Sequence, residues 1–416
     1  MNCSGTLARD FNHCLWHALK GVAHHLSRRS RGHWFIIACI LIVGTIGGHL
    51  LGTSDLWIEL RYAIYQTFSQ LITLHPPYPK RTVLVLVDDA DFWYGKFDHR
   101  TPLKRDLLAD LFKKIDAANP EVIALDVDLR SHALEPGQSD DPAYRDETQK
   151  LLDAVGAISK RRTVVLAKSV KYAGEGETEY VAESSVYDVR DFGDGRVMSG
   201  YITLPKDIRR VALDLKLHNG VSLDSFASAI ARAADDRSLV ETQEREKDAL
   251  PYGTFIAPGE FVQLPARDVL NANLDDEKDL AELKKKLGFK IVIIGGAWHE
   301  FGPGPGPMHD GHSSPVGEIY GAFIHANYTE ALLGTRTYRP MREWMATGIE
   351  VFFSVVMALI FSLHIRLVLR FAAAAFLCTF VVGVSYVSWQ NLGLFFDFFT
   401  PVVLLASHAV IDKMRE

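Results

Sequence analysis

Apolar residues gather in long, sparsely charged stretches at both ends of the chain, whereas the middle alternates short apolar runs with polar segments. Four of these stretches have about the length of a membrane-spanning helix, roughly 20 residues. They are residues 34–52, 344–363, 368–389 and 392–411. The pattern predicts an α-helical membrane bundle of four spans, with one large domain, residues 53–341, between the first span and the second.

The start of this middle part has the pattern of a strand, a helix and a second strand. Residues 83–87 form a continuous apolar run, which suits a strand buried on both faces. Residues 103–118 carry apolar positions at helical spacing, and Asn119-Pro120 ends that helix. A second apolar run follows at 122–125. This right-handed βαβ unit predicts an α/β domain with a mainly parallel, covered sheet.

Acidic residues follow both of these runs, and two glycines follow a third run at 291–294. The carboxyl ends of parallel strands meet at one edge of a sheet, where open α/β sheets bind ligands. The candidate ligand-binding residues are Asp88, Asp89, Asp91, Asp126, Asp128, Gly295 and Gly296. A small cation, a polyol or a divalent cation would suit these carboxylates. The alternative is that the acids cap the following turns and helix starts and bind nothing.

Histidines flank a glycine- and proline-rich segment at 302–307. The candidate metal ligands are His299, His309, Asp310 and His312. Imidazole and carboxylate groups together suit a transition metal. The alternative is a set of solvent-exposed loop histidines. No cofactor is predicted.

Charge and cysteine positions narrow the function classes. The net charge of −6 leaves no basic stripe for phosphates, so nucleic acid is not expected as a partner. The four cysteines, Cys3, Cys14, Cys39 and Cys378, all lie outside the middle domain. That domain therefore has no disulfide framework and no cysteine-based zinc site. A thiol-free domain suits an oxidising compartment outside the cytoplasm.

Basic residues before the first span and after the last predict cytoplasmic termini, with the large domain outside. Residues 1–33 are then a cytoplasmic amphipathic segment and residues 412–416 a cytoplasmic tail. Within the first span, Gly44 and Gly48 have the spacing of small residues that pack closely against another helix.

This order of one span, an α/β domain and three spans resembles CHASE domains of type two. These are extracellular or periplasmic sensory domains that precede cyclases and kinases. The stretches that carry the resemblance are 85–91, 122–129, 164–167, 283–295, 310–315 and 319–333. The last of these, 319–333, is predicted to be the helix that closes the domain. The family's tryptophan- and proline-rich turn is reduced here to Pro102 and a basic residue. Family members usually continue into an output domain, whereas only residues 412–416 follow the last predicted span.

The resemblance implies a stand-alone periplasmic sensor subunit in a bacterial inner membrane, which signals to or scaffolds a separately encoded partner. One alternative is an assembly subunit of a cell-envelope complex that homo-oligomerises through its periplasmic domain. A second is a periplasmic Asp-dependent phosphohydrolase, because 122–129 resembles the strand and Asp-x-Asp start of haloacid dehalogenases. The other residues of that mechanism cannot be placed in this sequence. No catalytic residues and no enzyme activity are therefore predicted.

Overall fold

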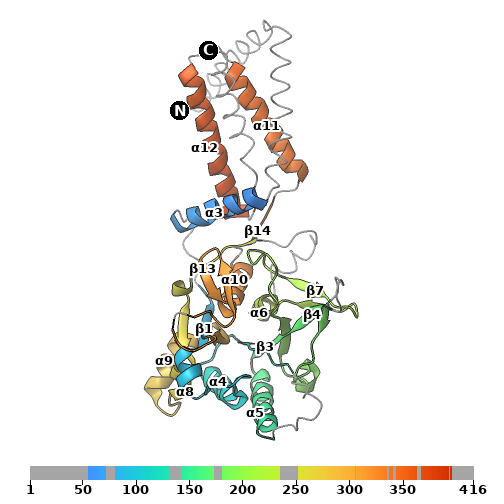
Figure 1. Cartoon of the computed structure of the whole chain (residues 1–416), viewed down its shortest axis with the longest axis vertical. Coiled ribbons are helices and arrows are strands. Elements are labelled where there is room, and N and C mark those ends of the chain that lie inside the picture. Colours follow the sequence, from blue (N-terminus) through green and yellow to red (C-terminus); the bar gives the residue numbers. More distant parts are fainter. Residues whose placement is uncertain are drawn as a thin grey trace, which may run out of the picture. The chain divides into compact units, whose positions relative to one another are not determined.

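The computed structural model describes residues 55–71, 80–130, 142–172, 180–234, 252–304, 306–334, 337–340, 343–362, 367–392 and 394–395. The chain divides into two compact units (Figure 1). One unit comprises Met1–Leu74 with Pro340–Glu416, and the other comprises His75–Arg339. The predicted domain, 53–341, also included the helix α3 (Asp55–Leu71), which falls in the first unit.

The unit His75–Arg339 is built on a six-stranded sheet in which every neighbouring pair is parallel. In spatial order the strands are β10 (Val262–Pro265), β1 (Thr82–Asp88), β11 (Ile291–Ala297), β2 (Val122–Asp126), β3 (Thr163–Lys168) and β6 (Val197–Tyr201). This arrangement confirms the predicted α/β domain with a mainly parallel sheet. The apolar runs predicted its central strands because strands covered on both faces need apolar residues at every position.

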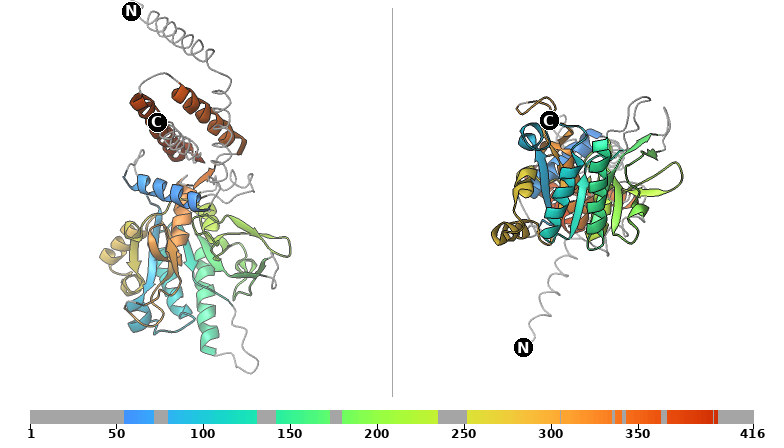
Figure 2. Two further views of the ribbon diagram at one scale, coloured as in Figure 1. Left: turned by 45° about the horizontal axis from the view of Figure 1, so that its top comes forward. Right: turned by 90° about the horizontal axis from the view of Figure 1, so that it is seen from below.

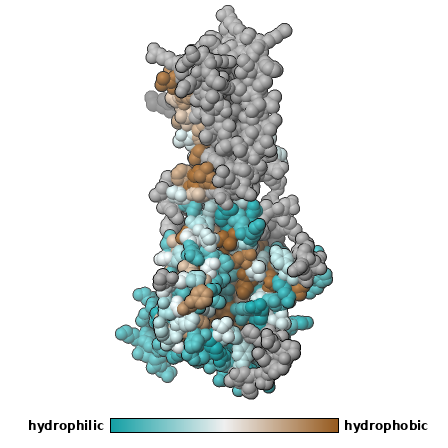
Figure 3. Space-filling model, in the orientation of Figure 1, coloured by the Kyte–Doolittle hydropathy of each residue, from teal (hydrophilic) through white to brown (hydrophobic). Residues whose placement is uncertain are grey.

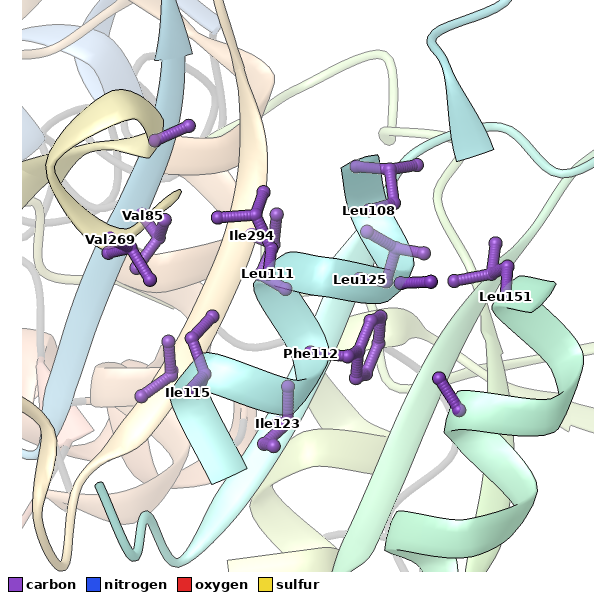
Figure 4. Close-up of a cluster of buried hydrophobic side chains, with 14 of the residues drawn as sticks. Val85, Leu108, Leu111, Phe112, Ile115, Ile123, Leu125, Leu151, Val269 and Ile294 are labelled. Carbon is purple, nitrogen blue, oxygen red and sulfur yellow. The ribbon is translucent and has the colours of Figure 1, made fainter. Parts of the chain in front are cut away.

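Alternate side chains of each strand enter two separate cores. On one face, Val85, Ile123 and Ile294 pack against a layer of four helices (Figure 2, Figure 4). These helices are α4 (Arg105–Ala117), α5 (Pro142–Ser159), α8 (Ala266–Asn271) and α9 (Glu277–Leu287). Leu111 and Phe112 of α4 reach this core because the helix is amphipathic.

On the other face, Leu84, Ala124 and Ile293 pack against α6 (Phe226–Ala234) and α10 (Gly321–Leu333). Every residue of α10 from Gly321 to Leu332 is buried, so this helix has no solvent-facing side. The sequence predicted a helix over 319–333. The helix begins two residues later, because Gly317–Tyr320 form the strand β13, which pairs with β12 (Gly311–Ser314).

The remaining strands among the described residues form small antiparallel pairings. They are β4 (Val170–Tyr172) with β5 (Tyr180–Ala182), β7 (Asp214–Lys216) with β8 (Ser222–Asp224), and β9 (Tyr252–Gly253) with β14 (Thr337–Pro340). These pairs are antiparallel and lie outside the main sheet.

The other unit contains α3, α11 (Glu343–Ser362) and α12 (Leu367–Leu392). Its surface exposes hydrophobic residues (Figure 3), and on α12 they recur at helical spacing. These residues are Phe376, Phe380, Val384 and Val387. Tyr65 of α3 stacks on Trp389 of α12 at a ring separation of 5.2 Å, which joins the two helices.

Only one helix among the described residues, Phe371–Gln390, is long and apolar enough to cross a membrane. The structure therefore does not confirm the predicted bundle of four spans. Within the predicted span 344–363, the apolar part of the helix is the shorter stretch Thr347–Met357. The predicted span 34–52, with Gly44 and Gly48, and nearly all of 392–411 lie outside the described residues.

Candidate functional site

The predicted acidic residues follow neighbouring strands of the sheet. In the strand register Asp88 of β1 lies opposite Ala297 of β11, and Gly295 of β11 lies opposite Asp126 of β2. The carboxyl ends of these strands therefore form one edge, which we call the acidic edge. The structure brings the residues to this edge but divides their side chains among separate contacts.

Asp88 and Asp91 share one cation, Arg267, which the sequence pattern does not indicate. Arg267 Nη1 donates to both carboxylate oxygens of Asp88, at 2.6 and 2.7 Å. The backbone N–H of Arg267 donates to Asp91 Oδ1 at 3.1 Å, and that of Asp91 donates to Asp88 Oδ1 at 2.9 Å. These contacts fasten the turn after β1 to the first turn of α8. The bond from Asp91 to Asp88 is of the kind expected where an acid holds its own turn, whereas the ion pair with Arg267 was not predicted.

The electrostatic environments of these two carboxyls differ. Burial works to raise the pKa of Asp88, but the hydrogen bonds and charge of Arg267 outweigh it, and the pKa is lowered. For Asp91, burial and then the charge of Asp88 raise the pKa. Arg267 therefore keeps Asp88 ionised and balances its charge.

Asp89 holds His299, one of the predicted metal ligands. Asp89 Oδ1 accepts the backbone N–H of His299 at 2.7 Å, and Oδ2 lies 2.7 Å from His299 Nδ1. The indole N–H of Trp93 donates to the carbonyl oxygen of His299 at 3.1 Å. These bonds join the segment after β1 to the segment after β11.

The other predicted metal ligands lie in two further arrangements. His309 stacks on Trp298 at 4.9 Å, and Trp298 stacks on Phe92 at 4.4 Å. His312 Nε2 lies 2.8 Å from Asp310 Oδ1. Across the described part of the chain, no three His, Cys, Asp or Glu side chains converge in a way that could hold a metal ion.

Asp126 is buried beside α10, and no lysine or arginine of the described residues pairs with it. Its side chain is 9% exposed, and its Oδ1 lies 3.8 Å from Nε2 of the buried His325, too far for a hydrogen bond. Burial raises the pKa of Asp126 to about 8, and the charge of Asp310 acts in the same direction. Burial lowers the pKa of His325 to about 4, so the two groups form a neutral pair at pH 7 rather than a salt bridge.

Gly295 allows the start of α10 to lie against the acidic edge. A Cβ at this position would lie 2.6 Å from the Cβ of Ala322, which is closer than carbon atoms can pack. At Gly296 a Cβ would meet the ring of Trp298. Both glycines are therefore explained by close packing within the domain, without reference to a ligand.

Asp128 lies at a separate position beyond the end of β2. Its Oδ1 accepts the backbone N–H of Arg130 at 3.0 Å and the hydroxyl of Ser169 at 2.9 Å. The side chain of Arg130 also pairs with it. Asp128 therefore holds its own turn and the end of β3.

A pocket of about 360 Å³ opens beside Asp88, between the ends of β10, β1 and β11 and the hairpin β12–β13. Most of its lining is apolar, with Leu86, Leu264 and Phe323 among the residues, and Glu318 and Tyr320 add polar groups. The pocket is not evident from the sequence, because residues 319–333 were predicted as one helix and no hairpin was predicted before it. The alternation of exposed Glu318 with buried Ile319 is the signal that could have indicated the strand β13.

Comparison with known proteins agrees with this fold. The family model described as CHASE2 domain matches residues 36–363, which is more than half of the chain. No significant match was found among the curated proteins or among the solved structures. CHASE2 domains are sensory domains that are typically extracellular or periplasmic. The chain belongs to the CHASE2 domain family.

Proposed function

We propose that this protein is a sensor subunit of a bacterial inner membrane that passes the state of its α/β domain to a separately encoded partner. The α/β domain lies in the periplasm, four spans anchor it, and both termini are cytoplasmic. The observation that carries the proposal is the placement of α10, which extends from the acidic edge to the opposite end of the sheet.

The first turn of α10 belongs to the acidic edge. The backbone N–H of Gly321 donates to the carbonyl oxygen of Asp310 at 3.0 Å, and Phe323 lines the pocket. His325 follows one turn later beside Asp126. A ligand or a charge change at this edge therefore acts directly on the start of the helix.

The last turn of α10 holds the start of the sheet. Glu330 Oε1 accepts the backbone N–H groups of Arg81 and Thr82, at 2.7 and 2.6 Å. Because α10 is buried on all sides, a displacement at one end is transmitted to the other rather than absorbed by bending into solvent. The chain then continues through β14 into α11, the second predicted span. Small helix shifts of this kind are a known form of signalling transition.

The proposal is tested by purifying the full-length protein from membranes in mild detergent and identifying what purifies with it. We expect a stoichiometric effector protein whose activity changes when residues 75–339 are deleted. An effector whose activity is the same with and without these residues would refute the sensor role. A large homo-oligomer with envelope proteins and no effector would support the assembly subunit instead.

A further inference from the structure

The pocket beside Asp88 has an apolar wall and an uneven distribution of charge. Leu86 and Leu264 come from the sheet, Ile319 from the hairpin and Phe323 from α10. Its volume of about 360 Å³ lies in the range of small-molecule sites, roughly 300–1,000 Å³. The pocket can therefore enclose the apolar body of a small ligand.

The carboxylates near the pocket differ in whether a cation balances them. Arg267 balances Asp88, and His299 holds Asp89. Within the described part of the chain, Glu318 makes no ion pair, and no Lys, Arg or His lines the pocket. Glu318 is exposed and lines the pocket, so it contributes a negative charge that no described cation balances.

Tyr320, which also lines the pocket, lies within the field of the same carboxylates. Burial raises the pKa of its hydroxyl, and the charges of Asp89, Glu318 and Asp88 raise it further. All three carboxylates thus act on one phenol at the side of the pocket. An anionic ligand would be repelled here, and a neutral one would leave Glu318 without a counter-charge.

We propose that the pocket binds a small organic cation, with its ammonium group at Glu318 and its apolar body against Leu264 and Phe323. This inference rests on the proposed sensor function and names the class of its stimulus. Glu318 and Phe323 lie on either side of the junction where β13 ends and α10 begins. A ligand that contacts both would fix the start of α10.

The test uses the full-length protein in detergent and isothermal titration with three probes of one chain length: hexylammonium, 1-hexanol and hexanoate. We expect hexylammonium to bind at least ten-fold more tightly than 1-hexanol, and hexanoate to bind weakest. Glu318→Gln should weaken the binding of hexylammonium about ten-fold and leave that of 1-hexanol unchanged. Glu277→Gln on α9, an exposed carboxylate outside the pocket, is the matched control and should change neither.

Equal binding of hexylammonium and 1-hexanol, an unchanged affinity in Glu318→Gln, or no binding of any probe would overturn the cation assignment. The sensor function is measured separately, through the activity of the co-purified effector. Binding of hexylammonium without a change in that activity would refute the sensor function and leave the cation site standing. An effector whose activity depends on the α/β domain, in a protein that does not bind hexylammonium, would refute the cation site and leave the sensor function standing.

Discussion

At the scale of single residues, the acidic edge contains carboxyl groups of the same type in opposite environments. Asp88 faces the guanidinium of Arg267 and has a lowered pKa. Among the described residues Asp126 has no such partner: burial, and then the charge of Asp310, raise its pKa to about 8. Both groups are subject to burial, and only Asp88 has a cation to offset it. That cation comes from tertiary structure, because Arg267 lies 179 residues from Asp88 in the chain.

Removing that partner should destabilise the domain. In Arg267→Ala, Asp88 and Asp91 lose their shared cation, and we expect the free energy of unfolding at pH 7 to fall by about 1 kcal/mol. The loss is moderate because Arg267 is 42% exposed and water screens the pair. Denaturation of the full-length protein in detergent measures it. Lys286→Ala breaks the exposed pair with Glu282 and should have a smaller effect, so equal losses would contradict the role of Arg267.

The buried carboxyl of Asp126 should make stability depend on pH. Its pKa rises from 3.8 in the unfolded chain to about 8 in the folded one, so the folded state retains a proton that the unfolded state releases. This contribution is complete below pH 3.8 and is lost as the pH rises through about 8. Asp126→Asn mimics the protonated acid. We expect it to remove most of the decrease in melting temperature between pH 5 and 9.

His325 contributes with the opposite sign. Its pKa falls from 6.5 to about 4 on folding, so its contribution is complete above pH 6.5 and is lost as the pH falls through about 4. Asp126→Asn should therefore still lose stability as the pH falls through about 4, because His325 is unchanged. Asp153→Asn on the exposed side of α5 is the control, and the same flattening in that variant would argue against Asp126.

At the scale of elements, α10 is the helix on which the acidic edge depends. Sequence pattern alone predicted this helix because residues 321–332 are largely apolar. The pattern could not indicate which side of the helix faces the sheet, since every side is buried. The hairpin β12–β13 was not predicted, because its strands are short and rich in glycine and polar residues, and the alternation at Glu318 and Ile319 is too brief to mark a strand against the helical pattern that follows. Its position depends on contacts with α10 and the sheet that are made only in the folded domain.

The contact of α10 with β11 can be tested at Gly295. In Gly295→Ala the new Cβ would lie 2.6 Å from that of Ala322, so the start of α10 must shift away from the sheet. We expect the free energy of unfolding to fall by about 1–3 kcal/mol. The output of the proposed effector should change as well. Gly306→Ala, where a Cβ meets no atom within 4 Å, is the control. Unchanged effector activity in both variants would contradict a role of α10 in signalling.

At the scale of the whole molecule, local patterns predicted the fold better than the site. Apolar runs specify β1, β2 and β11 because strands covered on both faces are apolar throughout. The site depends on pairings between distant residues, such as Asp89 with His299, which spacing along the chain does not encode. The four predicted metal ligands, His299, His309, Asp310 and His312, accordingly lie in three arrangements.

The proposed membrane topology has a direct measurement. We expect a cysteine placed at the exposed Lys160 to react with a membrane-impermeant maleimide in intact spheroplasts. A cysteine placed at Lys413, in the predicted cytoplasmic tail, should react only after lysis. Labelling at both positions without lysis would place the tail outside and contradict an even number of spans.

The burial of α10 on every side also determines how fast its backbone amide hydrogens exchange with solvent. Its amide hydrogens can exchange with deuterium only when the surrounding domain opens, so they are expected to exchange last. Their exchange rate then measures the global opening of the domain while the protein remains in its membrane. Exchange at α10 would thus report the stability of this sensory domain without any chemical denaturant.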